Sequence, residues 1–421
     1  MKQDIYLKRE FYLQQIVDRL DNGDIKIVTG PRRCGKSWLL KKIFKDYLLS
    51  IGVDEDHIII ISFDEEDESA QEDLTNKDAL KAFIYARITS DTEPYYVILD
   101  EVQEVEGFEK IVNGLNAHDN VDVYVTGSNS HFLSSDINTI FRGRGDEIRV
   151  HPLTFKEFCS EREEPTQELW KEYYTFGGMP ALLKYKTPQQ KINYLHRLWE
   201  KTYLADVVER NHIKNITSLS SLVDALCSSI GSLTNPHRIS NVMQSVQHVK
   251  LDSDTVQKYI NCLEDAFLFN SAKRFNIKGN KYFESIKKYY AVDIGLRNAK
   301  LNFRQQEMTH IMENVIYNEL IARGYLVDVG VVEVREKQEN TMKQIQYEVD
   351  FIATNGFEKY YIQSAFSLPT EEKRQQELKS LLKIDNSFRK FVIQGDDIAT
   401  YTDEHGITFM GLFQFLKEGL S

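Results

Sequence analysis

The chain has few of the residues that cross-link or stiffen small secreted folds, with only four cysteines and eight prolines among 421 residues. The cysteines lie far apart and form no CxxC pair, which argues against a zinc site and a disulfide framework. They are Cys34, Cys159, Cys227 and Cys262. No apolar run approaches the roughly 18 residues of a membrane span. The first twenty residues lack the apolar centre of a signal peptide. We therefore expect a cytoplasmic protein without membrane association.

Positive charge is also in short supply. The formal net charge is −12, which excludes a general electrostatic attraction to nucleic acid, although a local basic face remains possible. The content of 42% hydrophobic and 28% charged residues is typical of a packed globular protein. The length predicts two or three domains.

Residues 1–152 predict an α/β domain with a parallel sheet, because short apolar runs alternate with segments of helical periodicity. The expected strands are 25–30, 57–64, 94–101 and 121–128. The expected helices are 1–24, 36–52, 76–88 and 107–118. Such an alternation is expected when helices cover both faces of a parallel sheet.

The remainder of the chain divides into three further segments. Residues 153–231 are rich in aromatic residues at helical spacing and predict a helical lid or connector. Residues 232–284 read as helix, turn, helix and strand, which suggests a winged-helix unit. Residues 285–421 predict a small α/β domain in which a helix at 308–324 precedes three strands.

The motif "GPRRCGKS" at 30–37 satisfies the phosphate-loop pattern GxxxxGK[ST], between an apolar strand and an amphipathic helix. Backbone N–H groups of such a loop face the phosphates of ATP, Lys36 compensates their charge and the Ser37 hydroxyl ligates Mg²⁺. Cys34 is interpreted as a small packed residue, and Arg33 could contact an adjoining subunit or the C-terminal half. The predicted nucleotide-binding residues are Gly30, Pro31, Arg32, Arg33, Cys34, Gly35, Lys36, Ser37 and Trp38.

Two carboxylates end the strand "YYVILDE" in the form of a Walker B segment. Asp100 is expected to hold Mg²⁺ through water, and Glu101 to act as the base that polarises the attacking water. Together with the phosphate loop this pattern predicts ATP hydrolysis as well as binding.

Polar and basic residues after the next strand give weaker signals. Ser128 and Asn129 are candidates for a γ-phosphate contact, although an ordinary turn after a strand explains them as well. Arg142 and Arg144 are candidates for an arginine finger supplied to a neighbouring subunit, and Arg144 is the preferred one. The alternative for Arg144 is a loop arginine paired with a carboxylate such as Asp146.

The ordered set of motifs resembles bacterial and archaeal P-loop ATPases of the AAA+ superfamily that have a nuclease-like C-terminal region. The motifs are "GPRRCGKS", "ISFDEED", "ILDEVQ", "TGSNS", "RGRGDEIRVHPLTFKEF", "FGGMP", "KKYYAVDIGLRN", "MENVIYNELIARG", "YEVDFIA" and "YYIQSAF". The resemblance covers almost the whole chain. It implies an AAA+ ATPase core, a helical insertion, a winged-helix segment and a restriction-endonuclease-like domain. It assigns catalysis to Lys36, Glu101, Asn129 and Arg144, nucleotide contact to Ser128 and Asp100, and metal binding to Ser37 and Asp100.

The C-terminal segment departs from the pattern of active nucleases. Glu313 and Asp350 match two acidic positions of that pattern, with Glu348 beside them, but Gln363 and Ala365 stand where a carboxylate and a lysine are needed. We therefore expect this domain to be inactive as a nuclease.

Three functions remain in view. The leading hypothesis is a Mg²⁺-dependent ATPase whose nucleotide state controls contacts with a protein or DNA partner. The rivals are an ATP-dependent binding switch with little turnover and a DNA-processing ATPase or nuclease. The helix "SDTVQKYINCLED" at 253–265 has one lysine and three acidic residues, so any DNA binding by the winged-helix segment should be weak. A homo-oligomer is possible.

Overall fold

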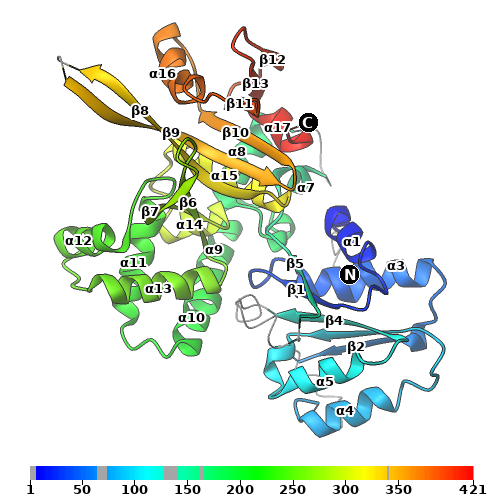
Figure 1. The fold of residues 1–421 in the computed structure, drawn as a ribbon. Coiled ribbons are helices and arrows are strands. Elements are labelled where there is room, and N and C mark those ends of the chain that lie inside the picture. The colour runs from blue at the N-terminus through cyan, green and yellow to red at the C-terminus, as the bar shows by residue number, and fades with distance from the viewer. Residues whose placement is uncertain are drawn as a thin grey trace. The chain divides into compact units, whose positions relative to one another are not determined.

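The computed structural model describes residues 6–63, 74–127, 141, 143–160, 165–338 and 341–420 (Figure 1). The chain divides into two compact units. One contains Met1–Pro152 together with Asp265–Phe267, and the other contains Leu153–Glu264 together with Leu268–Ser421. Each unit is built around a sheet of its own.

The first unit has a five-stranded sheet in the order β2-β3-β4-β1-β5, and every pair of neighbours is parallel. The strands are β1 (Ile25–Thr29), β2 (Ile58–Ser62), β3 (Tyr95–Asp100), β4 (Val121–Gly127) and β5 (Gly145–Arg149). The predicted parallel α/β domain is confirmed. The edge strand β5 was missed, because its sequence GDEIR has a single apolar residue and reads as a loop.

Helices cover both faces of this sheet, so the inner strands are apolar on both sides (Figure 1). The first helix is shorter than predicted, because Arg9 adopts a left-handed conformation at φ 46° immediately before it. The helices of the first face are α1 (Glu10–Val17), α2 (Lys36–Trp38), a π-helical turn (Leu39–Phe44) and α3 (Lys45–Ser50). Those of the other face are α4 (Lys77–Tyr85) and α5 (Phe108–Leu115).

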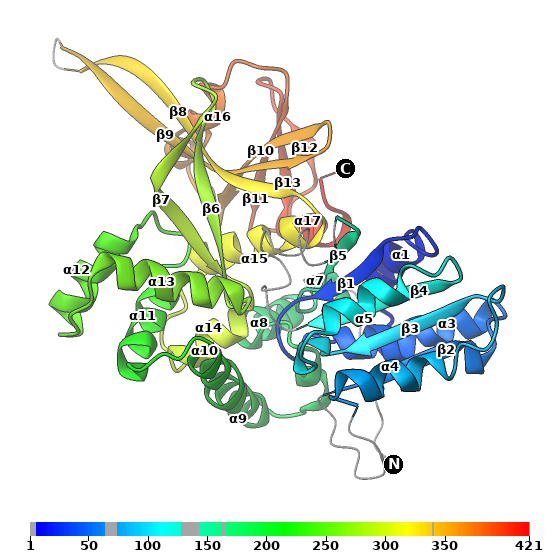
Figure 2. The same cartoon turned by 60° about the horizontal axis from the view of Figure 1, so that its bottom comes forward.

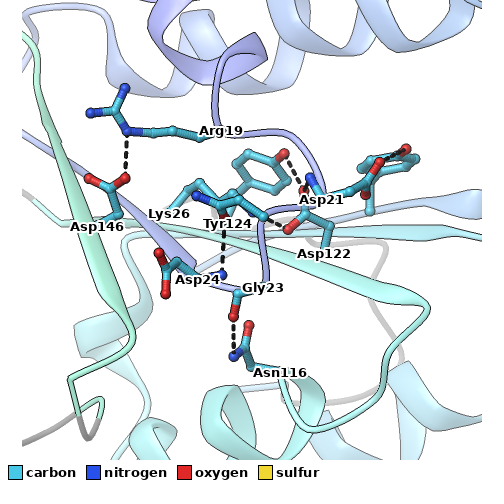
Figure 3. Close-up of polar contacts among 11 residues, drawn as sticks. Arg19, Asp21, Gly23, Asp24, Lys26, Asn116, Asp122, Tyr124 and Asp146 are labelled. Atoms are coloured by element: carbon cyan, nitrogen blue, oxygen red, sulfur yellow. Dashed lines mark hydrogen bonds and ion pairs between the residues drawn. The ribbon is translucent and has the colours of Figure 1, made fainter.

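A buried ion pair joins β1 to β4 (Figure 3). The Lys26 ammonium is fully buried and contacts the Asp122 carboxylate. Asp122 also accepts hydrogen bonds from the Tyr124 hydroxyl at 2.6 Å and from the backbone N–H of Asp21 at 3.1 Å. The ammonium, the hydroxyl and the N–H group all bind the same carboxylate. Because Asp21 belongs to the loop before β1, this loop is fixed to the amino-terminal end of the sheet.

We predict that Lys26→Met destabilises the first unit by about 3–5 kcal/mol, because it leaves the Asp122 carboxylate buried without its cation. Lys42→Met is the matched control, since Lys42 pairs with Asp46 on the surface of a helix and its loss should cost less than about 1 kcal/mol. Urea unfolding measures both, followed by the fluorescence of Trp38 in a background in which Trp170 and Trp199 are replaced by phenylalanine. Equal unfolding midpoints for the two variants would contradict the prediction.

The second unit begins with a series of helices and continues into an α/β region. Its helices are α7 (Phe155–Cys159), α8 (Gln167–Phe176), α9 (Pro188–Leu198), a π-helical turn (Trp199–Leu204), α10 (Ala205–Arg210), α11 (Ile216–Ser228), α12 (Pro236–Val246), α13 (Ser253–Asp265, whose last residue is assigned to the first unit), α14 (Ile294–Lys300), α15 (Met308–Ala322), α16 (Glu371–Leu382) and α17 (Leu412–Glu418). Within the described part of the chain, no helix combines the length and the apolar character that a membrane crossing needs.

The sheet of the second unit has eight strands in the order β12-β13-β11-β10-β9-β8-β6-β7. The strands are β6 (Phe269–Asn276), β7 (Lys281–Ala291), β8 (Leu326–Gln338), β9 (Thr341–Asn355), β10 (Glu358–Ala365), β11 (Arg389–Gln394), β12 (Tyr401–Thr402) and β13 (Ile407–Gly411). The expected three-stranded meander is β8-β9-β10. The hairpin β6-β7 extends the same sheet, so the expected boundary between 284 and 285 lies inside β7 (Figure 2).

Two motifs without an assigned role, "FGGMP" and "VDIGLRN", form one packed joint in the second unit. The buried Asp293 carboxylate accepts hydrogen bonds from the N–H groups of Gly178 at 2.7 Å and Leu296 at 2.9 Å. A Cβ on Gly177 would lie 2.3 Å from this carboxylate, and a Cβ on Gly295 would lie 1.8 Å from the Phe176 carbonyl oxygen. Only glycine fits at these two contacts.

Candidate functional site

The phosphate loop connects β1 to α2 at the carboxyl end of the sheet. Gly30 has φ 138° and approaches the backbone so closely that a Cβ would lie 2.1 Å from the Val150 carbonyl oxygen. Gly35 has φ 102° and stands immediately before α2, which begins at Lys36. Both glycines therefore serve the turn itself, as the phosphate-loop pattern requires.

Lys36 is buried beneath this loop. Its ammonium donates hydrogen bonds to the carbonyl oxygens of Gly30 at 3.1 Å and Pro31 at 3.2 Å. The ammonium also lies 3.7 Å from the Glu101 carboxylate. The structure thus brings the positive charge of the loop next to the predicted catalytic base.

Asp100 ends β3 and is linked to two hydroxyl groups. One oxygen, Oδ1, accepts hydrogen bonds from Ser37 Oγ at 3.0 Å and from Thr126 Oγ1 at 2.6 Å. The other oxygen, Oδ2, is buried and accepts no hydrogen bond from the described residues, and Lys41 Nζ lies 3.8 Å away. Burial raises the pKa of the Asp100 carboxyl above its ordinary value, so a positive charge at Oδ2 would stabilise the carboxylate.

Glu101 follows in a left-handed conformation at φ 54°. Its backbone N–H donates to Thr126 Oγ1 at 2.8 Å, and its carboxylate accepts a hydrogen bond from Gln103 Nε2 at 2.6 Å. A left-handed conformation is uncommon for glutamate and costs of order 1–3 kcal/mol, and here Thr126 and Gln103 hold it in place.

Thr126 is the residue of this site that the sequence analysis missed. It lies on β4, beside β3, and its single hydroxyl donates to the carboxylate of Asp100 while accepting from the N–H of Glu101. The signal was present, since Thr126 is a polar residue in the apolar run VDVYVTG. The candidates predicted from the sequence, Ser128 and Asn129, follow the strand instead.

The other predicted loop residues take different positions. Cys34 is buried, its thiol donates to the Val150 carbonyl at 3.6 Å, and burial raises its pKa, as fits a packed residue. Arg33 is exposed at φ 64°, and Arg32 is partly buried. Trp38 turns toward the N-terminal segment, where its indole N–H donates to the Leu7 carbonyl at 3.4 Å.

The remaining candidates are Ser128, Asn129, Arg142 and Arg144. Ser128, Asn129 and Arg142 lie outside the described residues. Arg144 is exposed and immediately precedes β5, at the opposite end of the sheet from the phosphate loop. Ile25, beside which Arg144 lies, and Thr29, which precedes the loop, are four residue steps apart on β1, so the separation along the strand is about 13 Å. Asp146 pairs with Arg19 at 2.7 Å, not with Arg144 as the alternative had it.

The oxygen groups at this edge fit a magnesium ion. Mg²⁺ prefers hard oxygen ligands and is commonly held by one or two protein groups together with water and phosphate oxygens. The Ser37 hydroxyl and the free oxygen of Asp100 provide such groups next to the loop.

We predict that Thr126→Val slows ATP turnover by about tenfold or more while leaving ATP binding nearly unchanged. Valine keeps the shape but cannot bond to Asp100 or to the N–H of Glu101, so both carboxylates lose their alignment. Thr126→Ser keeps the hydroxyl and should retain most of the activity. Turnover and ATP affinity measured side by side test this. A tenfold loss of affinity in Thr126→Val, with turnover unchanged, would show that Thr126 acts on binding instead.

The parallel sheet and the phosphate loop are those of a P-loop nucleotide-binding domain. Residues 22–159 match a family model described as an AAA domain, and residues 167–307 match a domain of unknown function (DUF8612). An uncharacterized protein of Haemophilus influenzae is 34% identical over 394 residues, which are 92% of this chain and 93% of that protein. The chain therefore belongs to the same family as that relative, and its residues 22–159 form an AAA domain.

Other similarities are more distant. The uncharacterized protein MJ1544 of Methanocaldococcus jannaschii is 28% identical over 417 residues, covering 94% of this chain and 87% of its own. Among solved structures, the Aeropyrum pernix ORC1 protein in complex with DNA has a TM-score of 0.30 and 12% identity, over 71% of this chain and 93% of that one. Cdc6p from Pyrobaculum aerophilum has the same TM-score and identity, over 74% of this chain and 95% of that one.

Proposed function

We propose that this protein hydrolyses ATP with Mg²⁺ and uses its nucleotide state to control contacts of its C-terminal half. The observation that carries the proposal is the chain of hydrogen bonds from Ser37 through Asp100 to Thr126 and Glu101. It links the Ser37 hydroxyl to Asp100, whose Oδ2 accepts no hydrogen bond from the described residues, and to Glu101, whose carboxylate lies 3.7 Å from Lys36.

Each group has a role in the proposed reaction. The loop N–H groups and Lys36 bind the phosphates, and Ser37 and Asp100 hold Mg²⁺, which supplies positive charge when bound. Glu101 accepts a proton from water as the water oxygen bonds to the γ-phosphorus. The bond from that phosphorus to the bridging oxygen breaks, and ADP and phosphate leave.

Substitution of Lys36 and Glu101 tests this proposal. Lys36→Ala should lose both ATP binding and turnover, because the phosphates lose their cation. Glu101→Gln should still bind ATP but turn it over about a hundredfold more slowly, because an amide cannot accept the proton. Phosphate release and equilibrium ATP binding are measured for both variants and for the wild type. Equal phosphate release from all three would refute ATP hydrolysis at this site.

A second candidate function is a binding switch that turns over little ATP. It is favoured by the contacts of Glu101, whose carboxylate is held by Gln103 at 2.6 Å and lies 3.7 Å from Lys36. A base held in this way must be released before it can accept a proton. Tight ATP binding without turnover in the wild type, even with candidate partners added, would favour the switch.

We further propose that Arg144 acts on the ATP of a neighbouring copy of the chain. It is exposed, and at about 13 Å of strand from its own loop it cannot reach the phosphates bound there. An arginine finger supplied in trans requires such a position.

Mixing two inactive variants tests this role of Arg144. Arg144→Ala should lower turnover by about 10³-fold. Adding Lys36→Ala protein, which retains Arg144, should restore part of that turnover, because each copy supplies what the other lacks. Arg19→Ala, which removes a different arginine near β5, is the control. Turnover by Arg144→Ala at the wild-type rate would exclude the finger.

The C-terminal half is proposed to receive the nucleotide signal. Helices α11, α12 and α13 followed by the hairpin β6-β7 have the order of a winged-helix unit, which supports weak DNA binding or a protein contact there. Helix α15 followed by the β8-β9-β10 meander supports a restriction-endonuclease-like domain. The proposed domains are residues 1–152, 153–231, 232–284 and 285–421. Strand β7 spans the last of these limits and belongs to the eight-stranded sheet.

A further inference from the structure

Three carboxylates of the second unit converge on one buried lysine. Lys288 lies on β7, and its ammonium is 2.8 Å from Glu313 Oε1 on α15. On β9, Glu348 Oε1 lies 2.8 Å and Asp350 Oδ1 lies 3.5 Å from the same ammonium. Elements widely separated in the chain thus place one positive charge inside a group of three acids.

Further hydrogen bonds hold these acids in place. The Tyr290 hydroxyl donates to Glu313 Oε1 at 2.7 Å, and the N–H of Ser364 donates to Asp350 Oδ2 at 2.8 Å. The Ser364 hydroxyl is buried and has no hydrogen-bond partner among the described residues. His310 Nδ1 lies 4.0 Å from Glu313 Oε2.

The ammonium stays charged in this environment. Burial lowers the pKa of Lys288, but Glu313, Asp350 and Glu348 raise it by more, so the net change is upward. A single positive charge therefore lies among up to three negative charges. Loss of the lysine would leave these carboxylates buried without a cation, which is strongly unfavourable.

In the nuclease pattern, a carboxylate at the position of Gln363 on β10 would join these acids, but Gln363 does not contact them. Gln363 points to the other face of the sheet, where its amide donates to Glu377 of α16 at 3.4 Å. Ala365 packs on that face as well. Because side chains alternate along a strand, Ser364 is the residue of β10 that faces Asp350. Gln363 and Ala365, the two positions that depart from the nuclease pattern, therefore lie on the face of the sheet away from this group.

We propose that Lys288 is a built-in cation that fills this acidic centre and closes it to divalent metal ions. Carboxylate oxygens that converge from two elements are the ligands that a Ca²⁺ or Mg²⁺ ion takes, at 2.0 to 2.6 Å in proteins in general. Here the ammonium meets the same oxygens through hydrogen bonds. The centre holds β7, β9 and α15 together and performs no metal-dependent chemistry.

The test replaces the cation and then offers a metal. Lys288→Met should lower the thermal midpoint of the full chain in EDTA by about 5 °C or more. Added Ca²⁺ should recover most of that loss in a saturable way, because the three carboxylates are then free to bind it. Nucleotide is left out, so that the phosphate loop does not contribute a metal response.

Two controls isolate the centre. Lys287→Met changes the neighbouring lysine, whose side chain faces the opposite side of β7, and should show no response to Ca²⁺. Lys288→Met combined with Asp350→Asn should remain destabilised when Ca²⁺ is added. A recovery that survives Asp350→Asn, or a Lys288→Met variant as stable as the wild type, would overturn the proposal.

The wild type keeps the proposal testable even if Lys288→Met does not fold. Wild-type protein free of nucleotide should show no rise in midpoint with Ca²⁺. A rise that Asp350→Asn abolishes would show an open metal site and would refute the proposal.

Discussion

The carboxylate of Asp100 is the group on which the nucleotide site depends. It is buried at the end of a central strand, and burial alone would make its charge unfavourable. The hydroxyls of Ser37 and Thr126 offset part of that cost and in doing so tie the start of α2 to β3 and β4. The other oxygen accepts no hydrogen bond from the described residues, and in the proposed reaction it is the oxygen that faces Mg²⁺.

At the phosphate loop and around Lys288, buried carboxylates need compensation for their charge, and the two clusters meet this need in different ways. At the loop, Asp100 accepts two hydrogen bonds on one oxygen, while its other oxygen accepts none from the described residues and has Lys41 at 3.8 Å. In the second unit, Lys288 comes from a strand of the sheet itself and closes the acidic centre. The first arrangement suits a ligand that comes and goes, and the second suits a permanent joint.

The sequence predicted the parts of the fold that local pattern determines. Four of the five strands of the first sheet and the phosphate loop were predicted, because these strands are almost continuously apolar and the loop has a fixed glycine spacing. Strand β5 was missed because it has a single apolar residue, and Thr126 was missed because one hydroxyl in a strand has no spacing signal. Lys288 could not be predicted, since nothing in "KKYY" tells which lysine faces inward until the bulge between β6 and β7 is known.

The joint between Gly177, Gly295 and Asp293 has a consequence for how relatives of this protein are recognised. Its glycines are required by contacts too close for any side chain, and its carboxylate by the N–H groups that it receives. These contacts concern packing and touch no ligand-binding residue named above. The two motifs therefore indicate an architecture, whereas the residues at the carboxyl edge of the first sheet bear on the proposed activity.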